Sequence, residues 1–291
     1  RKGTRVSNWD MQDSEYMGLM KLDALRLGTL TVLSECKRLV YQNCTGDFIY
    51  HPESDCYFIG NKAFDWDDTC EDLGLFEYTK LVLDDHKVFK MLSEGKTAGV
   101  FQLSGYACTK VCKDMGINSF DDIVAVLALA RPGPLNSGMT DNYIAGKKYG
   151  WKESKYKKYH EIVKDTFGVP IYQEQIMRVF TDMAGLSGGV ADKIRKVIGK
   201  KREASEFEPY RLMFLEGCQN QEDSFSEKEA NEFWKELLSF AHYAFNKSHS
   251  VEYAMISFWT AWMKYHHPTE YLAAFLTRSE ERRVGKECRS R

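Results

Sequence analysis

The sequence has no long apolar run and no apolar segment near its start. Its longest apolar stretch, VEYAMISFWTAWM, is shorter than a membrane span and contains Glu252. The first residues, RKGTRVSNWD, lack the apolar centre of a signal peptide. They do not begin with methionine either, which favours a cut chain. These absences argue against a membrane or secreted protein, and we expect a cytoplasmic one.

Cysteine pairs, prolines and net charge are also scarce. None of the eight cysteines forms a CxxC pair, so free thiols are favoured over a zinc site, with a thiol-bound metal as the weaker alternative. The sequence shows no internal repeat, and it has only six prolines among 291 residues, as expected of a globular protein. The formal net charge of −2 does not indicate a polyanionic partner, so any such role must come from the charge distribution.

Helical patterns dominate from about residue 84 onward. Ser119 and Asp122 form a capping box before the apolar run IVAVLALA. Apolar residues also recur at helical spacing over 172–183 and over 233–241. Residues 41–80 have no helical period and predict an irregular or small β-containing connector. The sequence therefore predicts a mainly α fold.

The stretch GLMKLD, residues 18–23, is predicted to form a short strand that leads into a helix ending near residue 35. Side chains alternate along a strand, so Lys21 and Asp23 would share one face about 7 Å apart. Such a pair can bind a metal ion and an adjacent phosphate. A surface ion pair is the alternative.

A rigid turn, RPGPLNSGM, follows the predicted helix that contains IVAVLALA. Two prolines restrict its backbone, while Gly133 permits unusual backbone angles. Arg131 begins this turn at the end of an apolar helix. Its planar guanidinium suits phosphate binding. The alternative is a helix-end cation that stabilises the helix dipole.

The clearest charge feature is a predicted basic helix, GGVADKIRKVIGKKR. Its apolar stripe would be Val190, Ile194, Val197 and Ile198, and its exposed basic residues would be Lys193, Lys196 and Lys200, with Arg195 beyond them. Residues 146–202 contain fourteen Lys or Arg against six Asp or Glu. This segregation favours a polyphosphate partner, either nucleic acid or a nucleoside triphosphate. A solvated basic surface is the alternative.

A polar run, FNKSHS, directly precedes the apolar stretch near the C-terminal end. Lys247 and His249 can donate to phosphate, and Asn246 can orient a base or a sugar. The alternative is a polar segment that only caps the following helix, through Ser248 or Ser250.

Taken together and in this order, these motifs resemble the bacterial replicative DNA polymerase III alpha subunit, a family C DNA polymerase. The matching pieces cover most of residues 17–277. They are GLMKLDALRLGTLTVL, LDDHKVFKMLSEGKTAGVFQL, FDDIVAVLALARPGPLNSGMTDNYI, FGVPIYQEQIM, ADKIRKVIGKK and YAFNKSHSVEYAMISFWTAWMKYHHPTEYLAAFL.

The resemblance implies a fragment that joins the end of a palm domain to a helical fingers domain. We expect a palm piece at 1–35, a connector at 36–83, helical fingers at 84–277 and a non-native or disordered tail at 278–291. Asp23 would be the catalytic residue and metal ligand in a two-Mg²⁺ site. The two other aspartates belong to an upstream Pro-Asp-x-Asp-x-Asp type motif that this sequence does not contain.

The resemblance also implies that Lys21 lies near the incoming triphosphate, that Arg195 and Lys196 occupy the paired-arginine positions of the helix that grips it, and that FNKSHS lines the nascent base pair or the template. Lys196 stands where the family has a second arginine. With the residues singled out above from the sequence pattern, the expected nucleotide-binding and DNA-binding residues are Lys21, Arg131, Lys193, Arg195, Lys196, Lys200, Asn246, Lys247 and His249. Primer-template DNA and deoxynucleoside triphosphates are the implied substrates, and a sliding clamp and clamp loader are the expected partners. The divergence from the family pattern is typical of a phage-encoded or remote member.

We expect the fragment alone to be inactive, because one aspartate cannot hold two metal ions. The alternative function is a non-catalytic helical module that binds single-stranded nucleic acid through residues 146–202 and stacking aromatic side chains.

Overall fold

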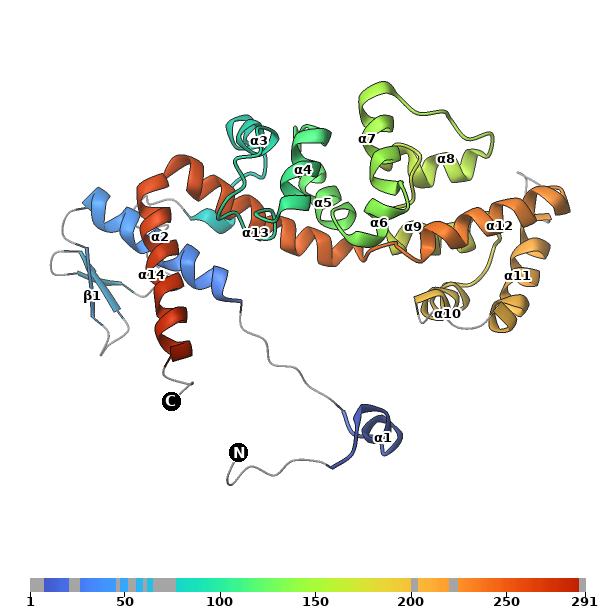
Figure 1. Cartoon of the computed structure of the whole chain (residues 1–291), viewed down its shortest axis with the longest axis horizontal. Helices are drawn as coiled ribbons and strands as arrows, with labels where there is room; N and C mark the ends of the chain where they lie inside the picture. Colours follow the sequence, from blue (N-terminus) through green and yellow to red (C-terminus); the bar gives the residue numbers. More distant parts are fainter. Residues whose placement is uncertain are drawn as a thin grey trace.

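The computed structural model describes residues 8–20, 27–45, 48–51, 56–59, 62–64, 77–199, 204–219 and 225–287. Over these residues the protein is mainly helical and elongated, and α1 lies apart from the other helices (Figure 1). The first helices are α1 (Met11–Tyr16), α2 (Gly28–Thr45), α3 (His86–Ser93), α4 (Tyr106–Met115), α5 (Phe120–Leu129), α6 (Pro132–Asn136) and α7 (Met139–Tyr149). The remaining helices are α8 (Lys157–Val163), α9 (Gln173–Arg178), α10 (Gly188–Gly199), α11 (Ala204–Gln219), α12 (Glu227–Ala241), α13 (Lys247–His266) and α14 (Pro268–Glu287).

The long helix α13 runs through the middle of the molecule and contacts α5, α3, α2 and α14 (Figure 1). It contains the apolar stretch VEYAMISFWTAWM, and its buried face includes Ala254, Phe258 and Ala261. The small alanines let α5 approach closely, while Phe258 fills the space toward Phe89 of α3, with ring centroids 5.9 Å apart. Burial of this face explains why the stretch is strongly apolar without crossing a membrane. No helix within the described ranges is long and apolar enough to span a bilayer.

A second core lies among α8 to α12. The large side chains Phe180, Phe214 and Trp234 meet there, with the centroids of Phe214 and Trp234 5.4 Å apart. The apolar stripe over 172–183 is buried as predicted, although the helix changes from α9 to the π-helical segment η3 (Val179–Met183) within it. The short 3-10 segment η2 (Lys164–Thr166) joins α8 to the loop before α9.

A third, smaller core joins α2, α14 and the end of α13. It contains Leu33 and Met263, and the Tyr271 hydroxyl in α14 donates to the Gly99 carbonyl at 2.7 Å. The helix predicted to end near residue 35 continues to Thr45, because its second half also packs against α14.

The connector has the predicted β content. Strands β1 (Phe48–His51), β2 (Cys56–Ile59) and β3 (Lys62–Phe64) form an antiparallel sheet in that order, with Ile49 opposite Phe58 and Phe58 opposite Ala63. The 3-10 segment η1 (Tyr78–Lys80) then leads to α3.

Two predictions at the ends of the chain differ from the structure. Residues 18–20 of the predicted strand form a turn and an irregular segment, with Gly18 at φ 74°, and no described strand lies beside them to supply hydrogen bonds. Residues 21–23 lie outside the described residues. At the other end, α14 continues to Glu287 through part of the tail predicted to be disordered. This part contains no proline and consists largely of good helix formers.

Two local features of the sequence can be followed at the start of α5 and in the α5–α6 turn. Ser119 and Asp122 form the predicted capping box at the start of α5. Gly133 lies within the helix α6, so its freedom to adopt unusual angles is not used, and the reason for glycine is space. A Cβ atom there would lie 2.4 Å from the Tyr243 ring.

Candidate functional site

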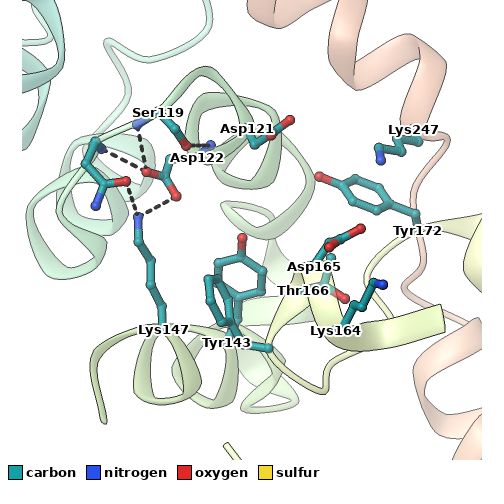
Figure 2. A pocket seen from close by; sticks show the side chains of 12 residues that line it. Ser119, Asp121, Asp122, Tyr143, Lys147, Lys164, Asp165, Thr166, Tyr172 and Lys247 are labelled. Carbon is teal, nitrogen blue, oxygen red and sulfur yellow. Dashed lines mark hydrogen bonds and ion pairs between the residues drawn. The ribbon is translucent and has the colours of Figure 1, made fainter. Parts of the chain in front are cut away.

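A polar cavity of about 590 Å³ opens between α5, α7 and the loop before α9 (Figure 2). Lysine, aspartate and hydroxyl side chains line it. Lys147 and Asp122 lie on one side of the cavity in this view, and Tyr172 and Lys247 lie on the other. Its complete lining is Asn118, Ser119, Asp121, Asp122, Tyr143, Lys147, Lys164, Asp165, Thr166, Phe167, Tyr172 and Lys247.

Tyrosine hydroxyls and lysine ammonium groups are among the hydrogen-bond donors that line this cavity. Burial raises the pKa of the Tyr143 and Tyr172 hydroxyls, so both stay protonated at neutral pH. The Lys247 Nζ lies 5.3 Å from the Tyr172 ring centroid, within the range of a cation–π contact. The polar cavity is therefore continuous with the first turn of α13, which contains the sequence-predicted Lys247 and His249.

The start of α13 is joined to the start of α9 by a short stretch of parallel pairing, which we call the junction (residues 171–174 and 244–247). The Phe245 N–H donates to the Ile171 carbonyl at 2.9 Å, and the Gln173 N–H donates to the Phe245 carbonyl at 2.8 Å. These bonds fix the position at which α13 begins. The polar run FNKSHS is consequently held against α9 rather than forming an independent loop.

Side chains from both strands of the junction cap α13. The Glu174 carboxylate accepts from the Lys247 N–H at 2.9 and 3.1 Å, and Asn246 Oδ1 accepts from the His249 N–H at 2.7 Å. The polar run does cap this helix, as in the alternative interpretation, but through Asn246 rather than Ser248 or Ser250. Asn246 is the N-cap, in line with the strong preference for asparagine at that position, and its side-chain oxygen is therefore occupied by the backbone.

Arg131 connects the α5–α6 turn to the same region. Its Nε donates to the Ala128 carbonyl in the last turn of α5, and its Nη2 donates to the Tyr243 carbonyl, both at 2.9 Å. The guanidinium carbon lies 4.1 Å from the Phe245 ring centroid. The bond to Ala128 places the guanidinium at the end of α5, as the helix-end alternative expects, and it leaves the phosphate-binding prediction open. Burial lowers the pKa of Arg131, but a guanidinium remains charged at neutral pH.

A smaller pocket of about 190 Å³ lies beside Arg131 and the first turns of α13. It is lined by Arg131, Phe245 and His249 together with Tyr253, whose ring centroid lies 4.2 Å from that of His249. Ser250 also lines it, and its buried Oγ has no hydrogen-bond partner among the described residues. The pocket therefore joins two of the sequence-predicted side chains, Arg131 and His249.

The predicted basic helix is α10, and its apolar stripe includes the buried Ile194 and Ile198. Lys193 is exposed, as predicted. Its basic surface is less uniform than expected because Asp192 neutralises part of it. The Asp192 carboxylate pairs with Lys196 at 2.7 Å and with Arg195 at 2.8 Å.

These two ion pairs, first with Lys196 and then with Arg195, lower the pKa of Asp192. Arg195 also donates from Nη1 to Gln173 Oε1 at 3.1 Å, which links α10 to the junction. Lys196 is largely exposed, and Lys200 lies outside the described residues.

The catalytic and metal-binding predictions cannot be placed in this geometry, because Lys21 and Asp23 lie outside the described residues. In the described part of the chain, no group of three or more His, Cys, Asp or Glu side chains could hold a metal ion. Cys36, Cys56, Cys108, Cys112 and Cys218 are free thiols.

Gln173 and Glu174, which hold the junction together, are not among the residues predicted from the sequence. A signal was present in FGVPIYQEQIM, where two polar residues follow an apolar extended segment and begin an amphipathic helix. This pattern indicates a helix start, but their partners Arg195 and Lys247 are distant in sequence. Only the tertiary structure identifies these contacts.

Comparisons with known proteins identify the family to which the chain belongs. The DNA polymerase III subunit alpha of Aquifex aeolicus is 38% identical over 279 residues, which cover 95% of this chain and 21% of that protein. The corresponding subunit of Thermus aquaticus is 35% identical over 284 residues, covering 95% of this chain and 20% of that protein. The subunit of Helicobacter pylori is 34% identical over 293 residues, which cover 99% of this chain and 21% of that protein.

The chain therefore spans about a fifth of the length of the curated relatives it matches. A family model described as the bacterial DNA polymerase III alpha subunit finger domain matches residues 67–222, which is more than half of the sequence. The chain belongs to the bacterial DNA polymerase III alpha subunit family and contains its finger domain.

Proposed function

We propose that this chain provides the fingers of a DNA-dependent DNA polymerase, which bind the incoming deoxynucleoside triphosphate during addition to a primer 3′ end. The observation that carries the proposal is the junction. It connects Arg195 of the basic helix, through Gln173, to the first turn of α13, which contains Lys247 and His249. The Arg195 side chain and the backbone that carries Lys247 and His249 are thereby held by one set of hydrogen bonds.

The triphosphate would contact cationic groups on two helices. Lys193 and Lys196 are exposed on α10, and Arg195 uses three of its five N–H groups within the protein, which leaves two for phosphate oxygens. Lys247 and His249 lie in the first turn of α13, where the helix dipole also favours a negative charge.

Asn246 and Arg131 have supporting roles in this proposal. The Asn246 side-chain oxygen caps α13, so it fixes the position of His249 instead of orienting a base. Arg131 holds the Tyr243 carbonyl and stacks on Phe245, so it supports the junction from the α5–α6 turn. Its Nη1 group remains for contact with a ligand in the smaller pocket.

The catalytic step itself rests on the resemblance to the family. Asp23 would be the catalytic metal ligand, with Lys21 beside it near the triphosphate. When bound, two Mg²⁺ ions would supply activation of the primer 3′ hydroxyl and stabilisation of the pyrophosphate leaving group. Primer-template DNA is the proposed second substrate, and the sliding clamp and clamp loader are proposed partners of the whole polymerase. We expect no primer extension by this chain alone.

The first test is a binding titration of this chain with a deoxynucleoside triphosphate and, separately, with primer-template DNA at several salt concentrations. We expect the combined Lys193→Ala, Arg195→Ala and Lys196→Ala variant to bind triphosphate more weakly and to show a shallower salt dependence for DNA. The matched control removes three exposed lysines from α3 and α4 (Lys87→Ala, Lys90→Ala and Lys110→Ala).

Unchanged affinity and salt slope in the α10 variant would contradict the proposed role of this helix. Salt-dependent binding of single-stranded DNA without any triphosphate binding would instead favour the non-catalytic binding module. In a longer polymerase containing this chain, Asp23→Asn is expected to abolish primer extension while leaving DNA binding largely intact.

A further inference from the structure

Gln173 lies where three parts of the proposed binding surface meet. Its side-chain Oε1 accepts from Arg195 Nη1 at 3.1 Å, and its Nε2 donates to the Ala244 carbonyl at 3.4 Å. Its backbone N–H donates to the Phe245 carbonyl at 2.8 Å. An amide side chain has an acceptor and donors on the same planar group, so one residue can contact both a guanidinium and a carbonyl. Gln173 uses both functions.

Among the described residues, Gln173 accepts the only hydrogen bond that Arg195 donates to another helix. Asp192, one turn earlier on α10, accepts from Arg195 Nε at 3.0 Å and from Nη2 at 2.8 Å. These bonds orient the guanidinium relative to its own helix. The bond from Nη1 to Gln173 orients it relative to the junction. Two anchors on different helices restrict the guanidinium plane more strongly than either one alone.

The same segment also holds the backbone from which the Lys247 side chain extends. Glu174, the next residue after Gln173, holds the Lys247 N–H with both carboxylate oxygens. The Arg195 guanidinium and the Lys247 backbone are therefore both hydrogen-bonded to the first two residues of α9. A shift of α9 or a loss of its hydrogen bonds would change the relative position of the two cations.

We propose that Gln173 is a positioning residue that couples Arg195 of α10 to the start of α13, so that both helices bind one deoxynucleoside triphosphate as a unit. In this proposal the amide of Gln173 contacts Arg195 and Ala244, and no phosphate contact is assigned to it. It acts through the orientation of Arg195. This inference rests on the proposed function, since it takes the triphosphate as the ligand of the two helices.

The test is a double-mutant cycle in which the affinity of this chain for a deoxynucleoside triphosphate is measured by titration calorimetry. Gln173→Met keeps the shape of the side chain and the backbone bond to Phe245 but removes both amide bonds. We expect it to weaken triphosphate binding about tenfold, on the order expected for one hydrogen bond to a charged group. Gln219→Ala, at an exposed position of α11, is the matched control and should leave affinity unchanged.

The Arg195→Ala background separates positioning from a purely structural role. If Gln173 acts through Arg195, adding Gln173→Met to Arg195→Ala will produce no further loss of affinity. If Gln173 only stabilises the start of α13, its substitution will weaken binding in both backgrounds, and the proposal is overturned. Thermal unfolding of each variant, followed by circular dichroism, verifies that all four proteins are folded at the temperature of the titration.

The remaining outcomes distinguish this inference from the proposed function. Normal affinity in Gln173→Met together with weak binding in Arg195→Ala would overturn the positioning role and leave the proposed function intact. Absence of triphosphate binding by the unsubstituted chain, under conditions in which it is folded, would overturn both.

Discussion

Replacement of Asp122 by alanine is expected to destabilise the fingers severely. The carboxylate accepts from the Asn118 N–H at 2.8 Å and from the Ser119 N–H at 3.1 Å, and it forms an ion pair with Lys147. The side chains of Asp122 and Lys147 are only 5% and 11% exposed. The pair is visible at the edge of the polar cavity (Figure 2).

The expected cost follows from what alanine leaves behind. Lys147 would keep its hydrogen bond to the Gly116 carbonyl at 3.0 Å, but its buried charge would have no counter-ion. Loss of one partner of a buried ion pair costs about 3–5 kcal/mol. The lost bonds to Asn118 and Ser119 belong to the same network, so they do not add independently. We therefore expect a loss of about 4 kcal/mol, a large part of the roughly 5–15 kcal/mol that stabilises a typical domain.

Urea unfolding of this chain, followed by circular dichroism, measures this loss. Asp114→Ala, an exposed carboxylate at the end of α4, is the matched control and should change the free energy of unfolding by no more than about 0.5 kcal/mol. The double variant Asp122→Asn, Lys147→Met removes both charges and should recover much of the loss. A cost of less than about 1 kcal/mol for Asp122→Ala would refute the reasoning.

Two further predictions concern single carboxylates. Burial raises the pKa of Asp85, but hydrogen bonds from His266 and from the backbone at the start of α3 outweigh it, so this pKa lies below its ordinary value of 3.8. The stability that comes from this lowered pKa is complete above about pH 4 and is lost as pH falls through the lowered pKa. We therefore expect Asp85→Asn to lose less thermal stability than the unsubstituted chain when pH is lowered from about 5 to about 2, as measured by thermal unfolding. Asp192→Asn removes the charge that neutralises Arg195 and Lys196. Titrations should therefore show about two- to fivefold tighter triphosphate binding at low salt, with a smaller difference at high salt. Weaker binding would mean that Asp192 chiefly orients these cations.

Several features of the site could be read from the sequence because they depend on neighbours along the chain. The Ser119 capping box and the apolar stripe of α10 follow from spacing alone. Two more signals were present but not used. Asp192 lies three and four residues before Arg195 and Lys196, which is the spacing of helical ion pairs. Asn246 is among the preferred residues for an N-cap.

Other features depend on contacts between distant residues. Arg131 bonds to the Tyr243 carbonyl, and Gly133 is needed because the ring of the same tyrosine approaches α6. No periodicity or local preference indicates such a neighbour, because the position of Tyr243 depends on how α12 and α13 pack. The predicted strand at 18–20 differs for the same reason, since a strand requires a partner that local sequence does not supply.

The sequence by itself determined that this protein is helical, that its basic residues are concentrated over 146–202 and that its motifs match one polymerase family. These properties follow from residue type and local spacing. The tertiary structure decided which of the predicted residues meet. It joined Arg195 to the first turn of α13 through Gln173, and it assigned Asn246 to capping and Arg131 to support. Hydrogen bonds between distant residues have specific distances and directions, and these are defined only when the helices have packed.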